Sequence, residues 1–166
     1  MSDIKTGTIQ ITGLADLERR LLDFPDKLAR NILGGAIRAG AVVIQREARL
    51  RAPVSDAPHV LISKRSKGMK LKGKQYMGTW IMPGNLRRNI KVRPAPRKNR
   101  TRAEPIEYWV YVSGKTAWYW KFVEFGTKKM SAKPFLRPAF DNQKGVALKA
   151  IRDYLAARIE KEAAKK

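Results

Sequence analysis

The stretch KFVEFGTKKMSAKPFLRPAF, residues 121–140, decides how we expect this chain to fold. Its opening residues, Phe122 and Phe125 among them, are typical of a strand, and Gly126 begins a basic turn. Pro138 suits the first turn of a helix, where an N–H group would have no partner in any case. The stretch therefore predicts a strand, a turn and a rigid helix start. It pairs no nucleophile with a base, so it indicates assembly by packing and not catalysis.

Charge is the strongest signal in the composition. The 36 Lys and Arg residues against 14 Asp and Glu give a formal net charge of +22 and a sequence pI near 10.7. Such a field favours polyanions, and nucleic acid would bind by counterion release whatever its base sequence. Acidic protein surfaces would be attracted by the same potential. The composition leaves both kinds of partner open.

Length and composition predict one domain over residues 1–166. Hydrophobic residues make up 43% of the chain, which is enough for a packed core. The chain has no cysteine, so we expect no disulfide and no thiolate metal site, in keeping with a reducing cytoplasm. The first residues lack the apolar region of a secretory signal, and no apolar run is long enough to span a bilayer. We expect no membrane association.

Apolar spacing predicts three helices. The first has an apolar repeat at Leu14, Leu17, Leu21 and Phe24 and ends before Pro25. A longer helix is predicted from Asp26 to Arg51, because Ala52 precedes a proline and avoids helical geometry. The last helix begins near Pro138 and runs almost to the end of the sequence.

Three glycines, Gly34, Gly35 and Gly40, fall inside the long predicted helix. Each weakens a helix by roughly 1 kcal/mol relative to alanine, so close packing must compensate. The helix could pack closely on the domain's own sheet or on a neighbouring subunit. We favour packing within the chain, which is the commoner reason for a glycine in a helix.

Three segments are predicted to be strands. Residues 86–93 alternate apolar and basic side chains, as in a half-buried strand, and residues 106–113 also alternate. Residues 117–125 are apolar on both faces, so they form a central strand or expose one face to another subunit. The expected fold is α+β: a small antiparallel sheet of three or four strands packed against the long helix of the N-terminal half and the C-terminal helix, with a long basic loop.

Two basic stretches are predicted to be loops. Residues 55–83 form a long insertion, and residues 94–105 form a proline-stiffened hairpin tip. Near the end of the insertion, Tyr76 and Trp80 are apolar residues beside a basic tract, which indicates docking. A solvated tract without a partner is the alternative. The cations expected to meet DNA phosphates or acidic partners are Lys64, Arg65, Lys67, Lys70, Lys72, Lys74, Arg97, Lys98, Arg100 and Arg102.

Residues that could carry catalysis are scarce. His59 is the only histidine, and without cysteine it predicts no zinc site. No glycine-rich phosphate-binding motif occurs. Glu104, Glu107 and Glu124 could clamp magnesium as in nucleases, but nothing in the sequence brings the three together. We therefore expect no enzyme activity, no cofactor and no metal site.

Glu124 lies in an apolar segment, where an unpaired charge would be costly. Its expected partner is Arg137, Lys128 or a cation of a neighbouring subunit, in a structural ion pair. We predict that Glu124 fixes the geometry of the strand and the turn.

Two pairs of short runs resemble the siphophage neck and tail-completion family, whose members join a DNA-filled head to a tail. A V-E-F-G-T-like run of that family is matched by residues 123–127, and a P-F-L-R-P-A-like run by residues 134–139. Upstream, an Ala-Pro-Val run at residues 52–54 and a G-x-L-R-x-x-I run at residues 84–90 also match. The family joins these two runs closely, so residues 55–83 are an insertion.

The resemblance implies a structural role. Copies would form a ring in the phage neck, sixfold to match the tail, which completes the tail and lets DNA pass. The implied partners are further copies of the chain, tail terminator or tail tube proteins, and head connector or stopper proteins, in a virion assembled in the host cytoplasm. The alternative is a free-standing nucleic-acid-binding protein without sequence preference, whose aromatic side chains would stack on bases.

A closed ring requires two different surfaces on each copy. We place one on the 121–140 stretch and the other on the long helix or near Trp80. The predicted contacts to a neighbouring subunit or ring are Phe122, Glu124, Phe125, Gly126, Thr127, Phe135, Leu136, Arg137, Tyr76 and Trp80.

Overall fold

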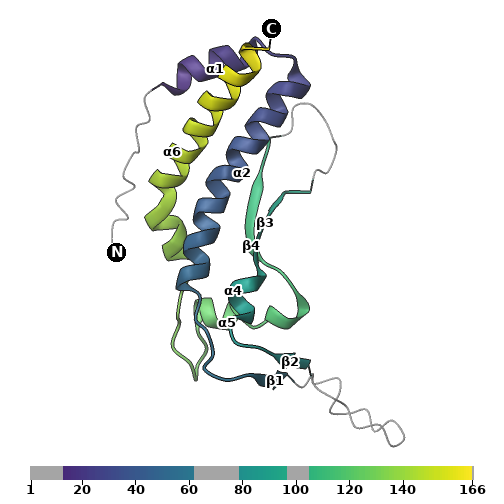
Figure 1. Cartoon of the computed structure of the whole chain (residues 1–166). Coiled ribbons are helices and arrows are strands. Elements are labelled where there is room, and N and C mark those ends of the chain that lie inside the picture. The colour runs from purple at the N-terminus through teal and green to yellow at the C-terminus, as the bar shows by residue number, and fades with distance from the viewer. Residues whose placement is uncertain (1–12, 62–78, 97–104, 166) are drawn as a thin grey trace, which may run out of the picture. The chain divides into compact units, whose positions relative to one another are not determined.

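The computed structural model describes residues 13–61, 79–96 and 105–165 (Figure 1). The described elements in chain order are α1 (Leu14–Leu22), α2 (Asp26–Arg51), β1 (His59–Leu61), β2 (Thr79–Ile81), α4 (Asn85–Asn89), β3 (Ile90–Pro94), β4 (Tyr108–Val112), the 3₁₀-helix η1 (Lys115–Ala117), α5 (Trp120–Phe125) and α6 (Leu136–Ala163). The fold is α+β, with a small antiparallel sheet and the two long helices α2 and α6, as the sequence predicted. The predicted bounds of α2 are confirmed at both ends.

The chain groups into two compact units. The first comprises residues 1–44, 92–110 and 141–166, and the second comprises residues 45–91 and 111–140. Each unit draws on separated segments, and α2 and α6 contribute residues to both. A single domain over residues 1–166 stays a prediction.

Helices form the core of the first unit. The buried residues Phe24, Ile32, Ala36, Leu155 and Ile159 cluster between α2, α6 and the turn after α1. In Figure 1, α2 and α6 lie side by side in this unit. Leu17, Leu21 and Leu28 pack against the cluster, so the predicted apolar repeats are the buried stripes of these helices.

Glycine allows α2 to approach α6 closely. A Cβ atom on Gly40 would lie 2.7 Å from Cγ1 of Ile151 and 3.0 Å from the carbonyl oxygen of Ala147. A Cβ atom on Gly35 would lie 2.7 Å from Cζ of Tyr154. Packing within the chain therefore explains these glycines, as predicted, although their partner is α6 and not the sheet.

Gly40→Ala is expected to lower the free energy of unfolding by about 1 kcal/mol, because overpacking costs roughly 2 kcal/mol and the better helix propensity of alanine offsets about half of that. Gly35→Ala is the matched control, since the exposed Tyr154 ring can rotate away from a methyl group there. We expect this control to be neutral or stabilising in urea denaturation. A Gly40→Ala chain as stable as the wild type would contradict the claim that Gly40 is needed for the close contact between α2 and α6.

The predicted sheet of three or four strands is instead two separate two-stranded sheets. β1 and β2 pair antiparallel, with Val60 opposite Trp80, so both ends of the predicted 55–83 loop are strands. Residues 62–78, between them, lie outside the described residues.

Strands β3 and β4 form the second sheet. The Ala95 N–H donates to the Glu107 carbonyl at 3.0 Å, and the Ser113 N–H donates to the Asn89 carbonyl at 2.7 Å. Both pairs have the same residue-number sum, which fixes an antiparallel register. The strand predicted over residues 106–113 is confirmed at its centre as β4.

Two strand predictions are wrong. Residues 117–125 form the end of η1 and helix α5, not a central strand. Of the strand predicted over residues 86–93, the first half is helix α4 and only the second half belongs to β3. Gly84, in the left-handed conformation at φ 74°, precedes α4 and allows the chain to turn into it.

Side-chain hydrogen bonds hold the end of α2 to α4 and β3 within the second unit. Gln45 Nε2 and Arg49 Nη2 both donate to the carbonyl of Ile90, each at 2.8 Å. Arg87 donates to the carbonyl of Leu50 at 3.3 Å, in the last turn of α2. A cation at the carboxyl end of a helix is favourable. These arginines therefore have structural partners in the chain.

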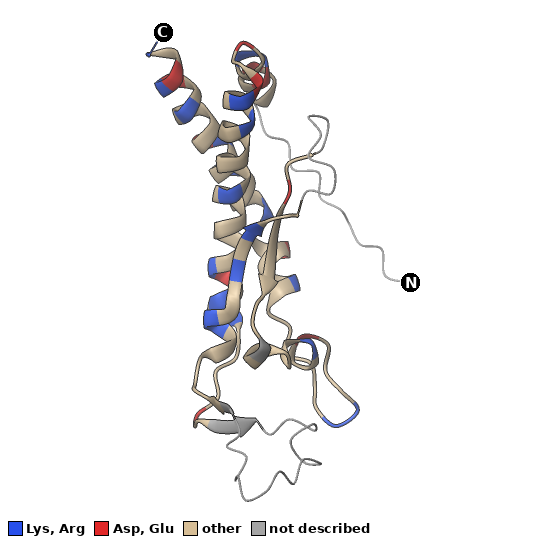
Figure 2. Ribbon diagram, turned by 90° about the vertical axis from the view of Figure 1, so that its right-hand side faces the viewer, with Lys and Arg blue, Asp and Glu red and all other residues tan. Residues whose placement is uncertain are grey.

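Basic residues outnumber acidic ones along the ribbon (Figure 2). The imbalance is greatest in the second unit, whose described segments carry 12 Lys and Arg. Glu47, Asp56 and Glu124 are the acids of those segments.

Candidate functional site

Glu124 caps helix α6 from the preceding helix, α5. The side chain is 6% exposed, and its Oε2 accepts hydrogen bonds from the backbone N–H groups of Phe135 (2.8 Å) and Leu136 (3.0 Å). Its Oε1 accepts from the N–H of Arg137 at 3.0 Å. The next residue, Pro138, has no N–H group. The first N–H groups of α6, which lack partners inside a helix, are thus satisfied by one carboxylate.

The ion pair predicted between Glu124 and Arg137 or Lys128 of the same chain is wrong. Among the described residues its partners are backbone N–H groups, and neither Lys128 nor the Arg137 side chain pairs with it. The positive end of the α6 dipole compensates the buried charge. The carboxylate joins α5 to α6 across the turn between them.

That turn depends on Gly126. It has φ 73°, which favours glycine, and a Cβ atom there would lie 2.9 Å from the Ala132 nitrogen and from the Met130 carbonyl oxygen. Its N–H donates to the Phe122 carbonyl at 2.9 Å and closes α5. Thr127 then pairs with Met130 in an isolated β-bridge. The V-E-F-G-T run therefore supplies both the cap for α6 and the turn that brings it into place.

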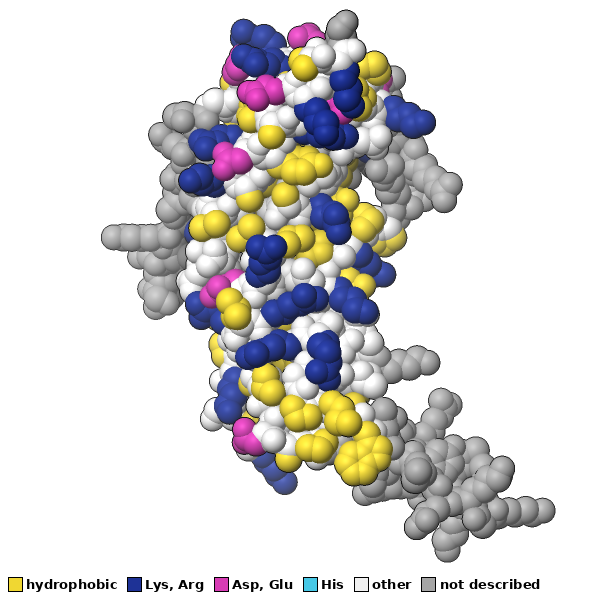
Figure 3. Space-filling view, in the orientation of Figure 1, with side chains coloured by type: hydrophobic (Ala, Val, Ile, Leu, Met, Phe, Trp, Pro, Cys, Tyr) yellow, Lys and Arg dark blue, Asp and Glu magenta, His cyan; other side chains and the backbone are white. Residues whose placement is uncertain are grey.

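Large hydrophobic side chains are exposed on the second unit. In Figure 3, hydrophobic side chains cluster at the lower end of the drawn face. Soluble monomers rarely expose wide apolar patches, so such a set indicates an interaction surface. Its members are Leu50, Val54, Trp80, Met82, Trp118, Phe122, Phe125, Met130 and Phe140.

Three of these residues, two in α5 and one in the turn that precedes it, form what we call the aromatic face of α5. Trp118, Phe122 and Phe125 follow helical spacing and are 54%, 45% and 75% exposed. The rings of Trp118 and Phe122 meet edge to face, with centroids 5.7 Å apart. The predicted contact residues Phe122 and Phe125 are thus available to a partner.

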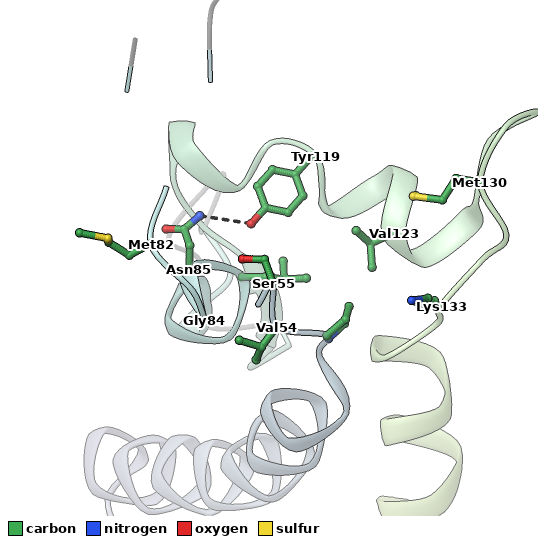
Figure 4. Close-up of a pocket in the computed structure, with 11 residues that line it drawn as sticks. Val54, Ser55, Met82, Gly84, Asn85, Tyr119, Val123, Met130 and Lys133 are labelled. Carbon is green, nitrogen blue, oxygen red and sulfur yellow. Dashed lines mark hydrogen bonds between the residues drawn. The ribbon is translucent and has the colours of Figure 1, made fainter. Parts of the chain in front are cut away.

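The other side of α5 lines an apolar pocket of about 260 Å³ (Figure 4). Tyr119, the N-cap residue of α5, and Val123 within α5 lie across it from Val54 and Met82. Asn85 Nδ2 donates to the Tyr119 hydroxyl at 3.4 Å. Met130 and Lys133, from the segment before α6, also line the pocket.

The predicted contact residues differ in how far they are exposed. Phe135 is fully buried, so it is a core residue and offers no surface to a neighbour, contrary to expectation. Leu136 is half-buried, whereas Thr127, Arg137 and Trp80 are exposed. Outside the described residues lie Tyr76 and all the predicted DNA or acidic-partner cations: Lys64, Arg65, Lys67, Lys70, Lys72, Lys74, Arg97, Lys98, Arg100 and Arg102.

The pocket was not predicted from the sequence. Its walls come from four segments of the chain. These are the residues after α2, the start of α4 with the residues before it, α5 with its N-cap residue, and the segment before α6. The G-x-L-R-x-x-I and V-E-F-G-T runs contribute to it, but neither run alone indicates a cavity. No group of three or more metal-ligating side chains occurs within residues 13–61, 79–96 and 105–165. In the same residues, no helix is both long and apolar enough to cross a bilayer.

A family model described as "Bacteriophage HK97-gp10, putative tail-component" matches residues 15–126, about two thirds of the chain. The chain belongs to the HK97-gp10-like family. Members of this family are structural tail components, typically without enzymatic activity. The matched region ends at Gly126, so it includes the capping residue Glu124 but not the helix that Glu124 caps.

The HK97-gp10-like assignment confirms the coarser part of the sequence prediction, a phage tail component and virion structural protein. No curated protein matches the chain significantly. No solved structure matches it significantly either.

Proposed function

We propose that this HK97-gp10-like protein is a subunit of a ring in the phage neck, which completes the tail and joins it to the head connector. The observation that carries the proposal is the aromatic face of α5, which is exposed beside the capped turn. A short helix and the turn before it that together present three exposed aromatic side chains suit protein assembly. DNA would pass through the ring.

A ring requires that one surface of a copy meets a different surface of the next. We assign the aromatic face of α5 to one side and Trp80, which is 62% exposed on β2, to the other. Sixfold symmetry would match a siphophage tail. The other partners would be tail terminator or tail tube proteins on one side and head connector or stopper proteins on the other.

Electrostatics opposes this self-assembly, because every copy carries +22. Burial of the exposed parts of three aromatic side chains contributes on the order of 5 kcal/mol per contact, which can offset the repulsion. Salt screens like charges. Ring formation is therefore expected to strengthen as ionic strength rises.

Replacing both Phe122 and Phe125 with alanine is expected to weaken ring formation at least tenfold, because the apolar contact area is lost. Mass photometry at several concentrations, with and without tail proteins, would measure this. Leu22→Ala is the control, since this leucine is 78% exposed but lies on α1 in the first unit. Rings of the double variant at wild-type concentrations would refute the assignment.

A free-standing nucleic-acid-binding protein is the rival function. It would bind duplex DNA with a steep negative salt dependence and form no ring. One of its candidate stacking residues is already engaged, because the Arg93 guanidinium lies 5.4 Å from the centroid of the Trp109 ring. The opposite signs of the two salt dependences separate the functions in one titration.

A further inference from the structure

The acids of the second unit leave its cations largely uncompensated. Glu124 is committed to the N–H groups of α6, and Glu47 pairs with Arg51 at 2.6 Å in the last turns of α2. Asp56 is exposed. The 12 Lys and Arg of the described segments therefore create a positive potential around an exposed apolar surface.

The pocket beside α5 combines both properties. Its walls include the hydrophobic side chains of Val54, Met82, Val123 and Met130, and Lys133 lies at its lining (Figure 4). The Lys133 backbone N–H donates to the Val123 carbonyl at 2.8 Å, which holds the main chain of Lys133 next to α5.

Two further lysines immediately precede the pocket residue Met130 in the chain. Lys128 and Lys129 lie in the turn that is closed by the bridge between Thr127 and Met130, and both are exposed. Met130, at the end of this turn, lines the pocket. The turn thus carries an apolar wall residue and two cations within three positions. No acidic residue lines the pocket.

We propose that this pocket docks an acidic peptide segment of another virion protein. One large apolar side chain of the segment would fill the pocket, and carboxylates beside it would pair with Lys133, Lys128 and Lys129. The inference rests on the proposed function in one respect, since it takes the partner to be a neighbouring protein in the neck.

Charge complementarity selects this occupant over the others. A second copy of the chain has 36 Lys and Arg against 14 acids, so it would bring further positive charge to a positive surface. A DNA duplex offers phosphates to the lysines but no apolar side chain to the pocket. An acidic segment with an apolar anchor satisfies both halves of the site.

The test uses the full chain and a fluorescein-labelled peptide, Glu-Glu-Asp-Leu-Phe-Glu-Asp-Glu, in fluorescence anisotropy at low salt. We expect binding that weakens severalfold when salt rises to physiological ionic strength, because the charged pairs are exposed. Two control probes are the same peptide with Ser-Ser in place of Leu-Phe and a 12-base-pair DNA duplex. The Ser-Ser peptide is expected to bind at least tenfold more weakly than the Leu-Phe peptide. Binding of the duplex is expected to be the same for the wild type and for a chain with Met130 replaced, because phosphates make no use of the apolar wall.

Two variants locate the site. Met130→Ser removes an apolar wall, and Lys133→Glu reverses the charge at the lining; each is expected to weaken peptide binding about tenfold. Lys161→Glu, on α6 in the first unit, is the charge-matched control and should bind as the wild type does. Thermal unfolding of Met130→Ser checks that the turn remains folded, and Lys133→Glu, at an exposed position, provides an independent test.

Three results would overturn the proposal: equal binding of the Ser-Ser peptide, equal effects of Lys161→Glu and Lys133→Glu, or DNA binding that depends on Met130. The variant with Phe122 and Phe125 replaced keeps the pocket lining, so it should bind the peptide normally. Loss of the ring with intact peptide binding in this variant would support both proposals. A wild-type chain that binds the peptide but forms no ring would refute the proposed ring alone.

Discussion

Glu124→Gln is expected to lower the free energy of unfolding by about 2 to 4 kcal/mol, because it removes a charged acceptor from three N–H groups, one buried and two part-buried. The amide that replaces the carboxylate keeps one acceptor oxygen but turns an NH₂ group toward N–H donors. At least one donor at the start of α6 is then left without a partner. The helix dipole also loses the negative charge that stabilises it.

Chemical denaturation of the purified chain measures this loss. Asp153→Asn makes the same chemical change at an exposed pair with Arg152, and we expect it to alter stability by less than about 0.5 kcal/mol. Glu124→Gln should also slow or abolish assembly, because the aromatic face of α5 is held next to the cap. If Glu124→Gln unfolds at the wild-type midpoint, the carboxylate does not stabilise α6.

Phe135→Ala is expected to lower the stability of the monomer, whereas Phe125→Ala is expected to leave it nearly unchanged, although both residues belong to the 121–140 stretch. Phe135 is fully buried, so its truncation should lower stability by about 3 to 5 kcal/mol, from lost transfer free energy and the cavity left behind. Phe125 is 75% exposed, and its truncation should change monomer stability by less than about 0.5 kcal/mol.

Thermal unfolding and mass photometry together distinguish the two roles. Phe135→Ala should unfold at a lower temperature at every concentration, and its assembly should fail because less folded chain is present. Phe125→Ala should fold normally and form fewer rings. A destabilised Phe125→Ala monomer would show that the aromatic face packs inside the chain and is not an assembly surface.

The sequence predicted helices well where apolar spacing and proline agree. Pro25 and Pro53 bound α2, and the repeat through Ile32 and Ala36 is its buried stripe. The same signals located α6, with Pro138 in its first turn. Both helices are long, so their periodicity outweighs local exceptions such as the glycines.

Secondary structure was predicted wrongly in one short segment that is rich in aromatic residues. Trp118, Tyr119 and Phe122 have strand propensity, so residues 117–125 resembled a strand apolar on both faces. These residues instead belong to the short helix α5 and the turn before it. Trp118 and Phe122 lie on the exposed aromatic face, and Tyr119 lies on the side that lines the pocket. Gly126 was the missed signal, because a glycine with positive φ commonly ends a helix.

The capping role of Glu124 could not be derived from the sequence. A buried carboxylate was expected to need a cation, and Arg137 is near enough in the chain to supply one. The actual partners are main-chain groups of residues 135–137, which become available only because the turn at Gly126 folds back. Backbone donors have no residue-type signature, so sequence reasoning cannot assign them. The pocket has the same origin, since four separated segments meet to form it.

The close contact of the α2 glycines with α6 also affects how the chain folds during its synthesis in the infected cell. Gly35 and Gly40 emerge from the ribosome long before Ala147, Ile151 and Tyr154, which cover them. Until then a nascent chain displays a bare, apolar groove along its longest early helix, and contacts so distant in sequence form slowly. We therefore expect newly made chains to depend on chaperones until α6 has left the exit tunnel.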